Sequence, residues 1–218
     1  MRAQPSRLES LLTPCSRVEN VRFGACEDSK YIKPTRMHYV ENGVARSWDF
    51  IESLDSVAIV LHHIEHNALL FVKQFRPALY ARLLREGQDS HNALRRSYTF
   101  ELCAGLVDKA GKSLEQIARE EVLEECGYSV KELESIGEFA TAVGHSGAKQ
   151  SLFYARIDEG MKASKGGGVD GEVIESVLVP CSELAAFVRD VSLPKTPGLG
   201  YGVMWFLTRQ FESRSNNA

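Results

Sequence analysis

The sequence predicts an α+β fold built around a mixed β-sheet, and three observations support this class. β-prone apolar runs of strand length fill both halves of the chain, the first strong helical pattern begins only near residue 114, and two more helical patterns lie near the C-terminus. This order of strands, one helix, strands and then helices differs from the regular strand-helix alternation of parallel α/β proteins. We therefore expect helices packed against a sheet whose strands run in both directions.

The first expected element is a β-hairpin over residues 36–50. Asn42 and Gly43 stand between two β-prone runs, and both residues readily adopt the positive φ angles of a two-residue turn. Further strands are predicted by short β-prone runs at residues 57–62, 69–75, 98–102, 133–143, 151–157 and 173–179.

Helical patterns predict three helices, at residues 114–126, 182–190 and 201–211. For the first of them, Ser113 is a good N-cap residue and Gly127 ends the pattern. The stretch 81–97 is rich in arginine and other polar residues, so we expect a long polar loop there. A second, flexible loop is expected at 162–171 because this stretch contains three consecutive glycines.

Composition excludes several classes of function. With 44% hydrophobic and 25% charged residues, the 218-residue chain is typical of a soluble globular protein. A net charge of −3 gives no general basic field for nucleic acid, and no apolar run approaches the roughly 18 residues of a membrane span. The five cysteines show no paired spacing, which favours free thiols in a reducing compartment. We therefore expect a cytoplasmic protein without a nucleic-acid or membrane partner.

The helix predicted at 114–126 carries four carboxylates within six residues, namely Glu120, Glu121, Glu124 and Glu125. Glutamates three or four residues apart are neighbours on a helix, and each like-charged pair costs about 0.2–0.5 kcal/mol. A nearby cation would offset this repulsion, and a hard divalent metal with oxygen ligands is the natural candidate, which points to phosphate chemistry. The alternative is an acidic helix face that is only solvated.

The spacing of these glutamates allows one helix to serve two surfaces. At about 100° per residue, Glu121, Glu124 and Glu125 fall on one arc of the helix. The adjoining side carries apolar residues that can pack on a sheet, namely Ala118, Val122 and Cys126. Gly105 precedes the helix, and a glycine at this place lets the backbone approach a metal or phosphate closely.

Residues 121–128, Glu-Val-Leu-Glu-Glu-Cys-Gly-Tyr, together with Ala104-Gly105, resemble the Nudix box, the signature of a family of diphosphate hydrolases. The resemblance covers roughly residues 36–211 and is closest to the UDP-sugar diphosphatase (UDP-glucose pyrophosphatase) branch, which is similar to the ADP-ribose pyrophosphatases. Outside the box it depends on residues 47–50, 71–77, 101–108, 193–196 and 205–207. It implies a Nudix-type α/β/α sandwich at residues 56–212, an N-terminal β extension at 1–55 and a tail at 213–218.

Two positions depart from the box. Counted back from Glu124, the box arginine should stand at position 120, where this chain has Glu120, although Arg119 precedes it. One residue along a helix turns a side chain by about 100°, so Arg119 does not simply replace that arginine. The early box glutamate is also absent, with Gly111 or Lys112 in its place. The arginine's role of orienting the glutamates is therefore either lost or supplied by another cation.

The resemblance implies a metal site and a catalytic site on the same glutamates. Glu121, Glu124 and Glu125, together with the backbone of Ala104, would hold Mg²⁺ or Mn²⁺. Ala104 and Gly105 would also border the substrate.

The resemblance also implies contacts with a nucleotide sugar. Arg76 follows a strand and would clamp the diphosphate, and Glu101 stands where related enzymes contact nucleotide or metal. Glu172 is the candidate general base because it lies near the glycine loop and can move with it. Trp48 and Phe50 share one face of a strand and would stack on uracil. Each of these residues also has a purely structural interpretation. The charged residues could be ordinary polar positions on or at the ends of strands, and the aromatic residues could serve in packing.

The implied reaction is Mg²⁺-dependent hydrolysis of the diphosphate of nucleoside diphosphate sugars, with UDP-glucose giving UMP and glucose 1-phosphate. ADP-ribose is the alternative substrate. A module that binds nucleotide sugars through a degenerate box is the alternative class. The N-terminal extension implies a homodimer whose active sites draw residues from both subunits.

Overall fold

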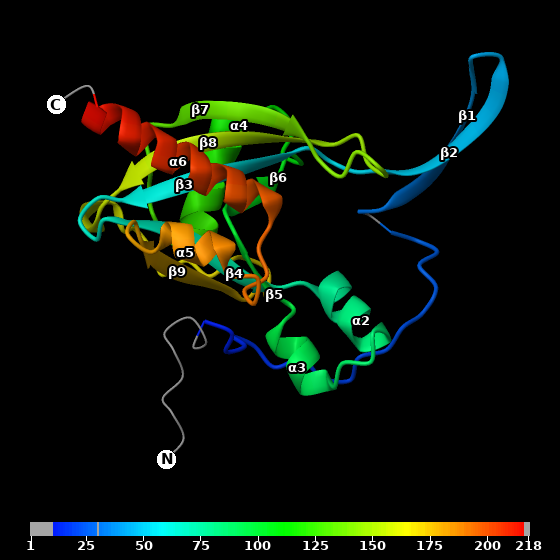
Figure 1. The fold of residues 1–218 in the computed structure, drawn as a ribbon, viewed down its shortest axis with the longest axis horizontal. Coiled ribbons are helices and arrows are strands. Elements are labelled where there is room, and N and C mark those ends of the chain that lie inside the picture. The colour runs from blue at the N-terminus through cyan, green and yellow to red at the C-terminus, as the bar shows by residue number, and fades with distance from the viewer. Residues whose placement is uncertain (1–10, 30, 216–218) are drawn as a thin grey trace.

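The computed structural model describes residues 11–29 and 31–215, and a seven-stranded mixed sheet forms its centre (Figure 1). Its strands are β3 (Ser56–His63), β4 (Ala68–Phe75), β5 (Tyr98–Glu101), β6 (Cys103–Leu106), β7 (Glu134–Ala140), β8 (Lys149–Ile157) and β9 (Ile174–Pro180). The strand order is β5-β4-β3-β8-β7, with β6 paired to β3 and β9 paired to β4. β3 and β8 are parallel, whereas the other pairs are antiparallel, so the predicted mixed sheet is confirmed.

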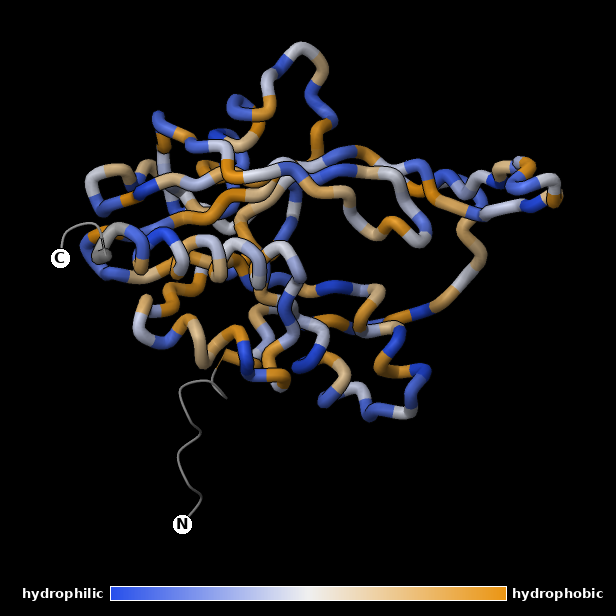
Figure 2. The backbone as a smooth tube through the Cα atoms, turned by 45° about the horizontal axis from the view of Figure 1, so that its top comes forward, coloured by the Kyte–Doolittle hydropathy of each residue, from blue (hydrophilic) through white to orange (hydrophobic). Residues whose placement is uncertain are grey.

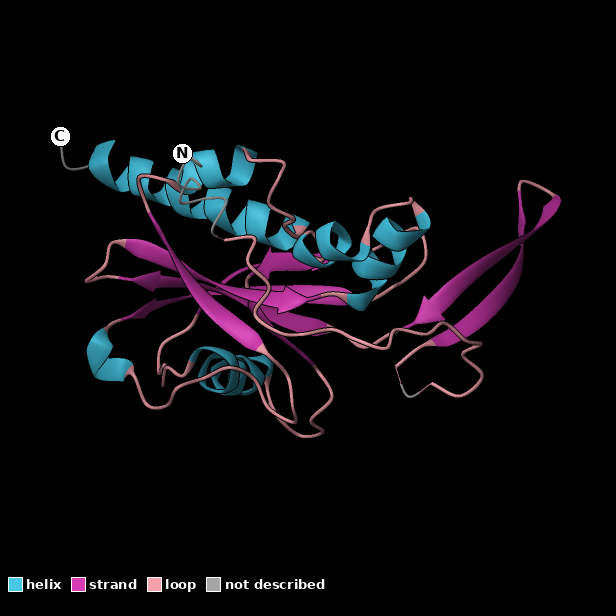
Figure 3. Cartoon of the chain, turned by 90° about the horizontal axis from the view of Figure 1, so that it is seen from below, coloured by secondary structure: helices cyan, strands magenta, loops and turns pink. Residues whose placement is uncertain are grey.

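Helices cover both faces of this sheet, which confirms the predicted sandwich (Figure 3). One face carries α4 (Leu114–Glu121) and the π-helical η1 (Val122–Cys126), and the other carries α5 (Leu184–Arg189) and α6 (Pro197–Ser215). Val57 and Ile59 of β3 pack toward α4, whereas the alternate residues Ala58 and Val60 pack toward α5 and α6. Burial on both faces explains why the central strands are continuous apolar runs.

β1 (Lys33–Glu41) and β2 (Val44–Glu52) form the predicted hairpin, which extends from the sandwich as an arm (Figure 1). Asn42 and Gly43 have φ angles of 51° and 78°, which confirms the turn that this dipeptide predicts. The arm touches the β7–β8 connection, where the indole Nε1 of Trp48 donates a hydrogen bond to the carbonyl of Gly144 (3.1 Å).

Residues 11–18 pack on the sandwich, residues 19–28 are exposed, and the segment 11–29 forms no strand. The ammonium of the buried Lys73 donates hydrogen bonds to the carbonyls of Leu11 (3.2 Å) and Thr13 (2.9 Å). The same ammonium pairs with Glu175 on β9 (2.6 Å). These contacts hold the N-terminal segment over the β4–β9 edge.

The prediction of a long polar loop at 81–97 is wrong, because the helices α2 (Pro77–Arg85) and α3 (Ser90–Arg95) occupy most of this stretch. Proline fits the first turn of a helix, and the side chain of Asp89 caps α3 by accepting hydrogen bonds from two backbone amides of its first turn. Figure 2 shows hydrophilic and hydrophobic stretches mixed through this region. The exposed Arg82, Arg85 and Arg96 mask the apolar spacing in the sequence. The buried side chains are Tyr80, Leu83 and Ala93.

Other helix boundaries also differ from the prediction. The last helix begins at Pro197 rather than at residue 201, and it continues to Ser215, into the segment expected as a tail. Residues 216–218 of that tail lie outside the described residues. The helix predicted at 114–126 changes from α to π hydrogen bonding at Val122. No helix within the described ranges is long and apolar enough to cross a membrane.

Candidate active site

β6 and the helix formed by α4 and η1 together build the predicted carboxylate site. The hydroxyl of Ser113 accepts a hydrogen bond from the amide of Gln116 (3.3 Å), and the side chain of Gln116 accepts one from the amide of Ser113 (2.8 Å). This capping box begins the helix. Gly127 ends it at a φ of 76°, a left-handed conformation that favours glycine. Both ends therefore lie where the sequence predicts them.

Glu125 and Glu121 turn toward β6. Glu125 is only 5% exposed, and its carboxylate accepts a hydrogen bond from the backbone N–H of Ala104 (3.0 Å). Glu121 lies directly over Gly105, where a Cβ atom would fall 2.0 Å from the Glu121 Cδ. The glycine is therefore needed for a close approach by the Glu121 side chain, whereas the predicted approach of a metal or phosphate stays a prediction.

Burial perturbs both carboxyl groups. It raises the pKa of Glu125 to about 8, against the opposing hydrogen bond from the Ala104 amide. It also raises the pKa of Glu121 to about 7, with a further contribution from the charge of Glu124. The charge of Glu172 acts in the same direction on both pKa values, so its carboxylate lies within electrostatic range of the pair. Strongly perturbed carboxyls grouped in this way are typical of functional sites.

Two lysines partly neutralise this acidic group. The ammonium of Lys109 lies 3.0 Å from Glu120, 3.4 Å from Glu124 and 4.0 Å from Glu121. Among the described residues, Lys112 pairs only with Glu120, at 2.5 Å. The repulsion between the glutamates predicts a nearby cation, and in this structure the Lys109 ammonium is one such cation, whereas the divalent metal stays a prediction.

Arg119, the neighbour of the box arginine position, points away from the glutamates. Its Nε donates a hydrogen bond to the carbonyl of Lys131 (3.1 Å). Glu120 occupies the box position itself and is bound by lysines. Lys109, rather than an arginine at the box position, is therefore the cation that contacts Glu121 and Glu124.

The donor set on the helix fits a hard divalent cation. All of the side-chain donors are carboxylate oxygens, and two of them belong to desolvated groups that repel each other. Within the described ranges the oxygens of Glu121, Glu124 and Glu125 are not gathered tightly around one point, and the Lys109 ammonium lies among them. A bound cation would therefore replace the Lys109 ammonium.

Arg76 and Glu101 form a bidentate ion pair beside this group. The Nε and Nη2 atoms of Arg76 donate to the two carboxylate oxygens of Glu101 at 2.6 and 2.5 Å, and Thr99 donates to the same carboxylate. The hydrogen bond with Glu101 raises the pKa of Arg76, and the charges of Glu125 and Glu172 contribute as well. Arg76 is half exposed, so its guanidinium has an outer edge that faces away from the pair.

The glycine loop is held against the carboxylate helix. The amides of Gly167 and Gly168 donate to the carbonyls of Glu125 (2.9 Å) and Glu124 (3.1 Å). Gly166, Gly167 and Gly168 all have positive φ angles, as this tight path requires. Glu172 follows this turn, and its carboxylate lies 3.4 Å from the amide of Val169. The structure thus brings Glu172 to the site through backbone contacts with the helix itself.

A pocket of about 570 Å³ lies next to Glu101 and Ala104, within the size range of small-ligand sites. Phe139 and Tyr201 stand at its wall in an edge-to-face pair with ring centroids 4.6 Å apart. Gln150 adds a polar group to the lining. No local sequence signal indicates these residues, because only the pairing of β7 with β8 and the docking of α6 bring them together.

The arm carries the two predicted stacking residues, Trp48 and Phe50, away from this pocket. Trp48 is 51% exposed, and neither residue lines the pocket beside Glu101 in the single chain. Arg76, Glu101, Glu121, Glu125 and Glu172 are the predicted site residues that the structure brings together around Ala104 and Gly105.

Comparison with known proteins identifies the class. No family model matches the chain. It is 38% identical to uridine diphosphate glucose pyrophosphatase NUDT14 of Bos taurus over 211 residues, covering 88% of this chain and 95% of the bovine protein. The NUDT14 protein of Mus musculus is 35% identical over 212 residues, covering 88% of this chain and 96% of the mouse protein. A GDP-mannose pyrophosphatase of Cronobacter sakazakii is 32% identical over 135 residues, which are 62% of this chain and 64% of the bacterial protein.

These likenesses, the sandwich fold and the glutamate helix over Gly105 show that the chain belongs to the Nudix hydrolase family. Within that family it is similar over nearly its whole length to the animal uridine diphosphate glucose pyrophosphatases.

Proposed function

We propose that the protein hydrolyses the diphosphate of nucleoside diphosphate sugars, and that it converts UDP-glucose and water to UMP and glucose 1-phosphate. The observation that carries this proposal is the convergence of Glu121, Glu125, Glu172 and the Arg76–Glu101 pair around one strand. The names of the animal and bacterial relatives, pyrophosphatases of UDP-glucose and GDP-mannose, support the same class of substrate.

The carboxylates of Glu121, Glu124 and Glu125, with the carbonyl of Ala104, would hold Mg²⁺ or Mn²⁺. Such an ion neutralises a diphosphate and lowers the pKa of a bound water. These glutamates must be deprotonated to bind it, which the raised pKa values of Glu121 and Glu125 oppose until a cation is present.

The chain's own residues would bind the substrate and move the proton. The outer edge of the Arg76 guanidinium donates hydrogen bonds to the diphosphate, while Glu101 holds its inner edge. Glu172 accepts a proton from the attacking water. The water oxygen bonds to one phosphorus, the bridging P–O bond breaks, and the departing phosphate oxygen carries the charge. The pocket beside Glu101 takes the nucleoside or sugar part of the substrate.

We propose a homodimer that uses the arm. Four large apolar side chains of the arm are more than two-fifths exposed: Met37, Val40, Val44 and Trp48. A second copy that covers them would also bring Trp48 and Phe50 toward the partner's pocket. Light scattering coupled to gel filtration should give twice the chain mass, and Val40→Ser with Val44→Ser should give a monomer. A monomeric wild-type protein would contradict this proposal.

We further propose a reducing compartment, with the cytoplasm as the simplest case. All five cysteines are free, and Cys103 and Cys126 are buried in the core beside the glutamate helix. Buried free thiols are the usual state in a reducing environment.

A substrate panel tests the proposed function. Purified protein with Mg²⁺ would be offered UDP-glucose, GDP-mannose and ADP-ribose, and the products would be separated by ion-exchange chromatography. The proposal expects UDP-glucose to be turned over fastest, and expects UDP-glucose and GDP-mannose each to give nucleoside monophosphate and sugar 1-phosphate in equal amounts. A preference for ADP-ribose would instead support the alternative function of an ADP-ribose diphosphatase. Binding of all three compounds without turnover would identify a binding module instead.

A further inference from the structure

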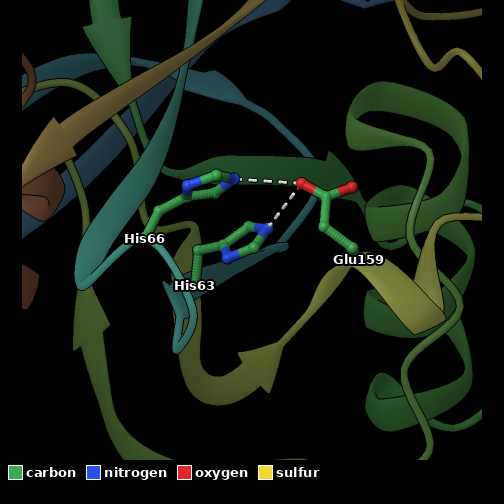
Figure 4. Close-up of side chains that lie close together, drawn as sticks. All are labelled: His63, His66 and Glu159. Atoms are coloured by element: carbon green, nitrogen blue, oxygen red, sulfur yellow. Dashed lines mark hydrogen bonds and ion pairs between the residues drawn. The ribbon is translucent and has the colours of Figure 1, made fainter.

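A second group of potential metal ligands lies outside the carboxylate site. His63 ends β3, His66 follows in the turn to β4, and Glu159 begins the short 3₁₀ helix η2 (Glu159–Met161) after β8. Figure 4 shows both imidazole rings directed at one carboxylate oxygen. That oxygen, Glu159 Oε1, lies 3.0 Å from Nε2 of His66 and 3.4 Å from Nε2 of His63.

His63 is the unusual member of this group. Its side chain is 0% exposed, and neither ring nitrogen has a hydrogen-bond partner among the residues that the structure describes. The contact with Glu159 has a distance compatible with an ion pair but not the geometry of a hydrogen bond. A buried polar group without a partner destabilises the fold, so the His63 ring is placed for an interaction that the described residues do not supply.

Two of the three separations between the ligand atoms are close to those around a tetrahedral ion. Bonds of about 2.0–2.1 Å from zinc to imidazole nitrogen and carboxylate oxygen place neighbouring ligand atoms roughly 3.3–3.4 Å apart. The Glu159 oxygen lies 3.4 Å from His63 and 3.0 Å from His66, with which it shares a hydrogen bond, and all three ligand atoms lie within 4.8 Å of one another. Two imidazoles and one carboxylate favour Zn²⁺ over Mg²⁺, which prefers oxygen ligands alone. We propose that His63, His66 and Glu159 bind a zinc ion at a site separate from the carboxylate helix.

The fourth ligand would be water or a neighbouring carboxylate. Glu65 lies between the two histidines in the chain, and its Oε2 accepts a hydrogen bond from the backbone amide of Glu159 (3.2 Å). The turn therefore already holds a second carboxylate beside η2.

An ion here would fasten the start of the segment that ends in Glu172. Residue 63 pairs with residue 157 across the parallel strands β3 and β8, so the ion would bridge two strand ends. From η2 the chain contacts the carboxylate helix: the amide of Ser129 donates to the carbonyl of Met161 (2.9 Å), and Lys162 donates to the carbonyl of Cys126 (2.8 Å). The glycine loop then follows. The proposed zinc is therefore structural, and it holds this segment against the helix.

Zinc titration in excess Mg²⁺ tests the site, with a chromophoric chelator as competitor and melting temperature as second readout. The wild type should bind one zinc ion per chain and melt at a higher temperature with zinc. His66→Asn and Glu159→Gln should each weaken zinc binding at least about tenfold, since even outer-shell changes have effects of that size. His91→Asn, which changes an exposed histidine on α3, should bind zinc as the wild type does.

Two further measurements separate this site from other ligands. His63→Leu should abolish zinc binding yet leave the metal-free protein at least as stable, because it removes two buried nitrogens that lack partners. Co²⁺ in place of zinc should give tetrahedral absorption bands without a thiolate charge-transfer band. The inference is overturned if the wild type binds no zinc at micromolar concentration, if zinc binding survives both His66→Asn and Glu159→Gln, or if the Co²⁺ spectrum shows thiolate ligands.

Discussion

The carboxylate of Glu121 lies over Gly105 so closely that a Cβ at position 105 would fall 2.0 Å from the Glu121 Cδ. This contact joins Gly105 on β6 to the glutamate helix, which begins at Leu114 after an intervening loop. The position of Glu121 therefore depends on the absence of a side chain at residue 105.

Gly105→Ala should displace Glu121 while leaving the fold intact, because the atoms in the way belong to a flexible side chain. A displacement of about 1 Å at a catalytic group lowers the rate by as much as about 100-fold, so kcat should fall by that order. Gly147→Ala is the matched control, since a Cβ there meets nothing within 4 Å. Steady-state kinetics and thermal melting measure the two effects. An active Gly105→Ala enzyme would show that Glu121 does not need its observed position.

Glu125→Gln should stabilise the metal-free protein at alkaline pH. The pKa of Glu125 is raised from its ordinary value of 4.5 to about 8, so the neutral acid favours the fold. The resulting stabilisation is complete below pH 4.5 and is lost as the pH rises through about 8. Glutamine stays neutral and can still accept the hydrogen bond from the Ala104 amide.

Thermal melting at two pH values checks this prediction. The melting temperature of Glu125→Gln should equal that of the wild type at pH 5 and should be several degrees higher at pH 8.5. Saturating Mg²⁺ should reduce the difference at pH 8.5. The exposed Glu132→Gln should follow the wild type at both pH values. Equal melting temperatures of Glu125→Gln and wild type at pH 8.5 would mean that burial of the charge at Glu125 has little effect on stability.

Lys109→Met should lower the Mg²⁺ concentration needed for half-maximal binding. The Lys109 ammonium lies within 4.0 Å of Glu120, Glu121 and Glu124, so it competes with an added cation for the same oxygens. Lys112→Met is a close control because Lys112 pairs with Glu120 and with none of the metal-site glutamates in the part of the chain that the structure describes. Isothermal titration of each variant with Mg²⁺ measures the change. Weaker binding to Lys109→Met would instead indicate that the lysine orients the glutamates for the metal.

Arg76→Lys should reduce kcat/KM by about 10- to 100-fold, because a lysine cannot hold Glu101 and a diphosphate with two parallel hydrogen bonds at once. This range corresponds to about 1.4–2.7 kcal/mol. Arg82→Lys alters an exposed arginine that pairs with Glu86 one turn further along, and it should have little effect. Unchanged kinetics for Arg76→Lys would remove Arg76 from the substrate site.

Local sequence signals predicted the elements whose causes are local. Asn42-Gly43 set the hairpin, and Ser113 and Gly127 set the ends of the glutamate helix. The helices α2 and α3 were missed because exposed arginines mask their apolar spacing. The π turn at Val122 was missed because the sequence pattern there remains helical.

The candidate site could be predicted only as separate pieces. The resemblance to the Nudix box predicted the glutamates. Lys109 reaches them from the loop between β6 and α4, and the residue spacing in the sequence does not indicate this contact. The contact of Arg76 with Glu101 depends on the pairing of β4 with β5. His63 and Glu159 lie 96 positions apart and meet only because β3 and β8 run parallel. Tertiary pairing, rather than local propensity, therefore accounts for what the sequence did not indicate.

The most direct test of the central claim compares three neutralised glutamates on one helix. Mg²⁺-dependent hydrolysis of UDP-glucose would be measured for the wild type, Glu124→Gln, Glu125→Gln and Glu120→Gln. If the glutamates proposed to hold the metal perform the reaction, Glu124→Gln and Glu125→Gln should lose at least about a thousandfold in kcat, while the lysine-bound Glu120→Gln stays within a few-fold of wild type. Equal, near-zero rates for all four proteins, with UDP-glucose still bound, would contradict the account.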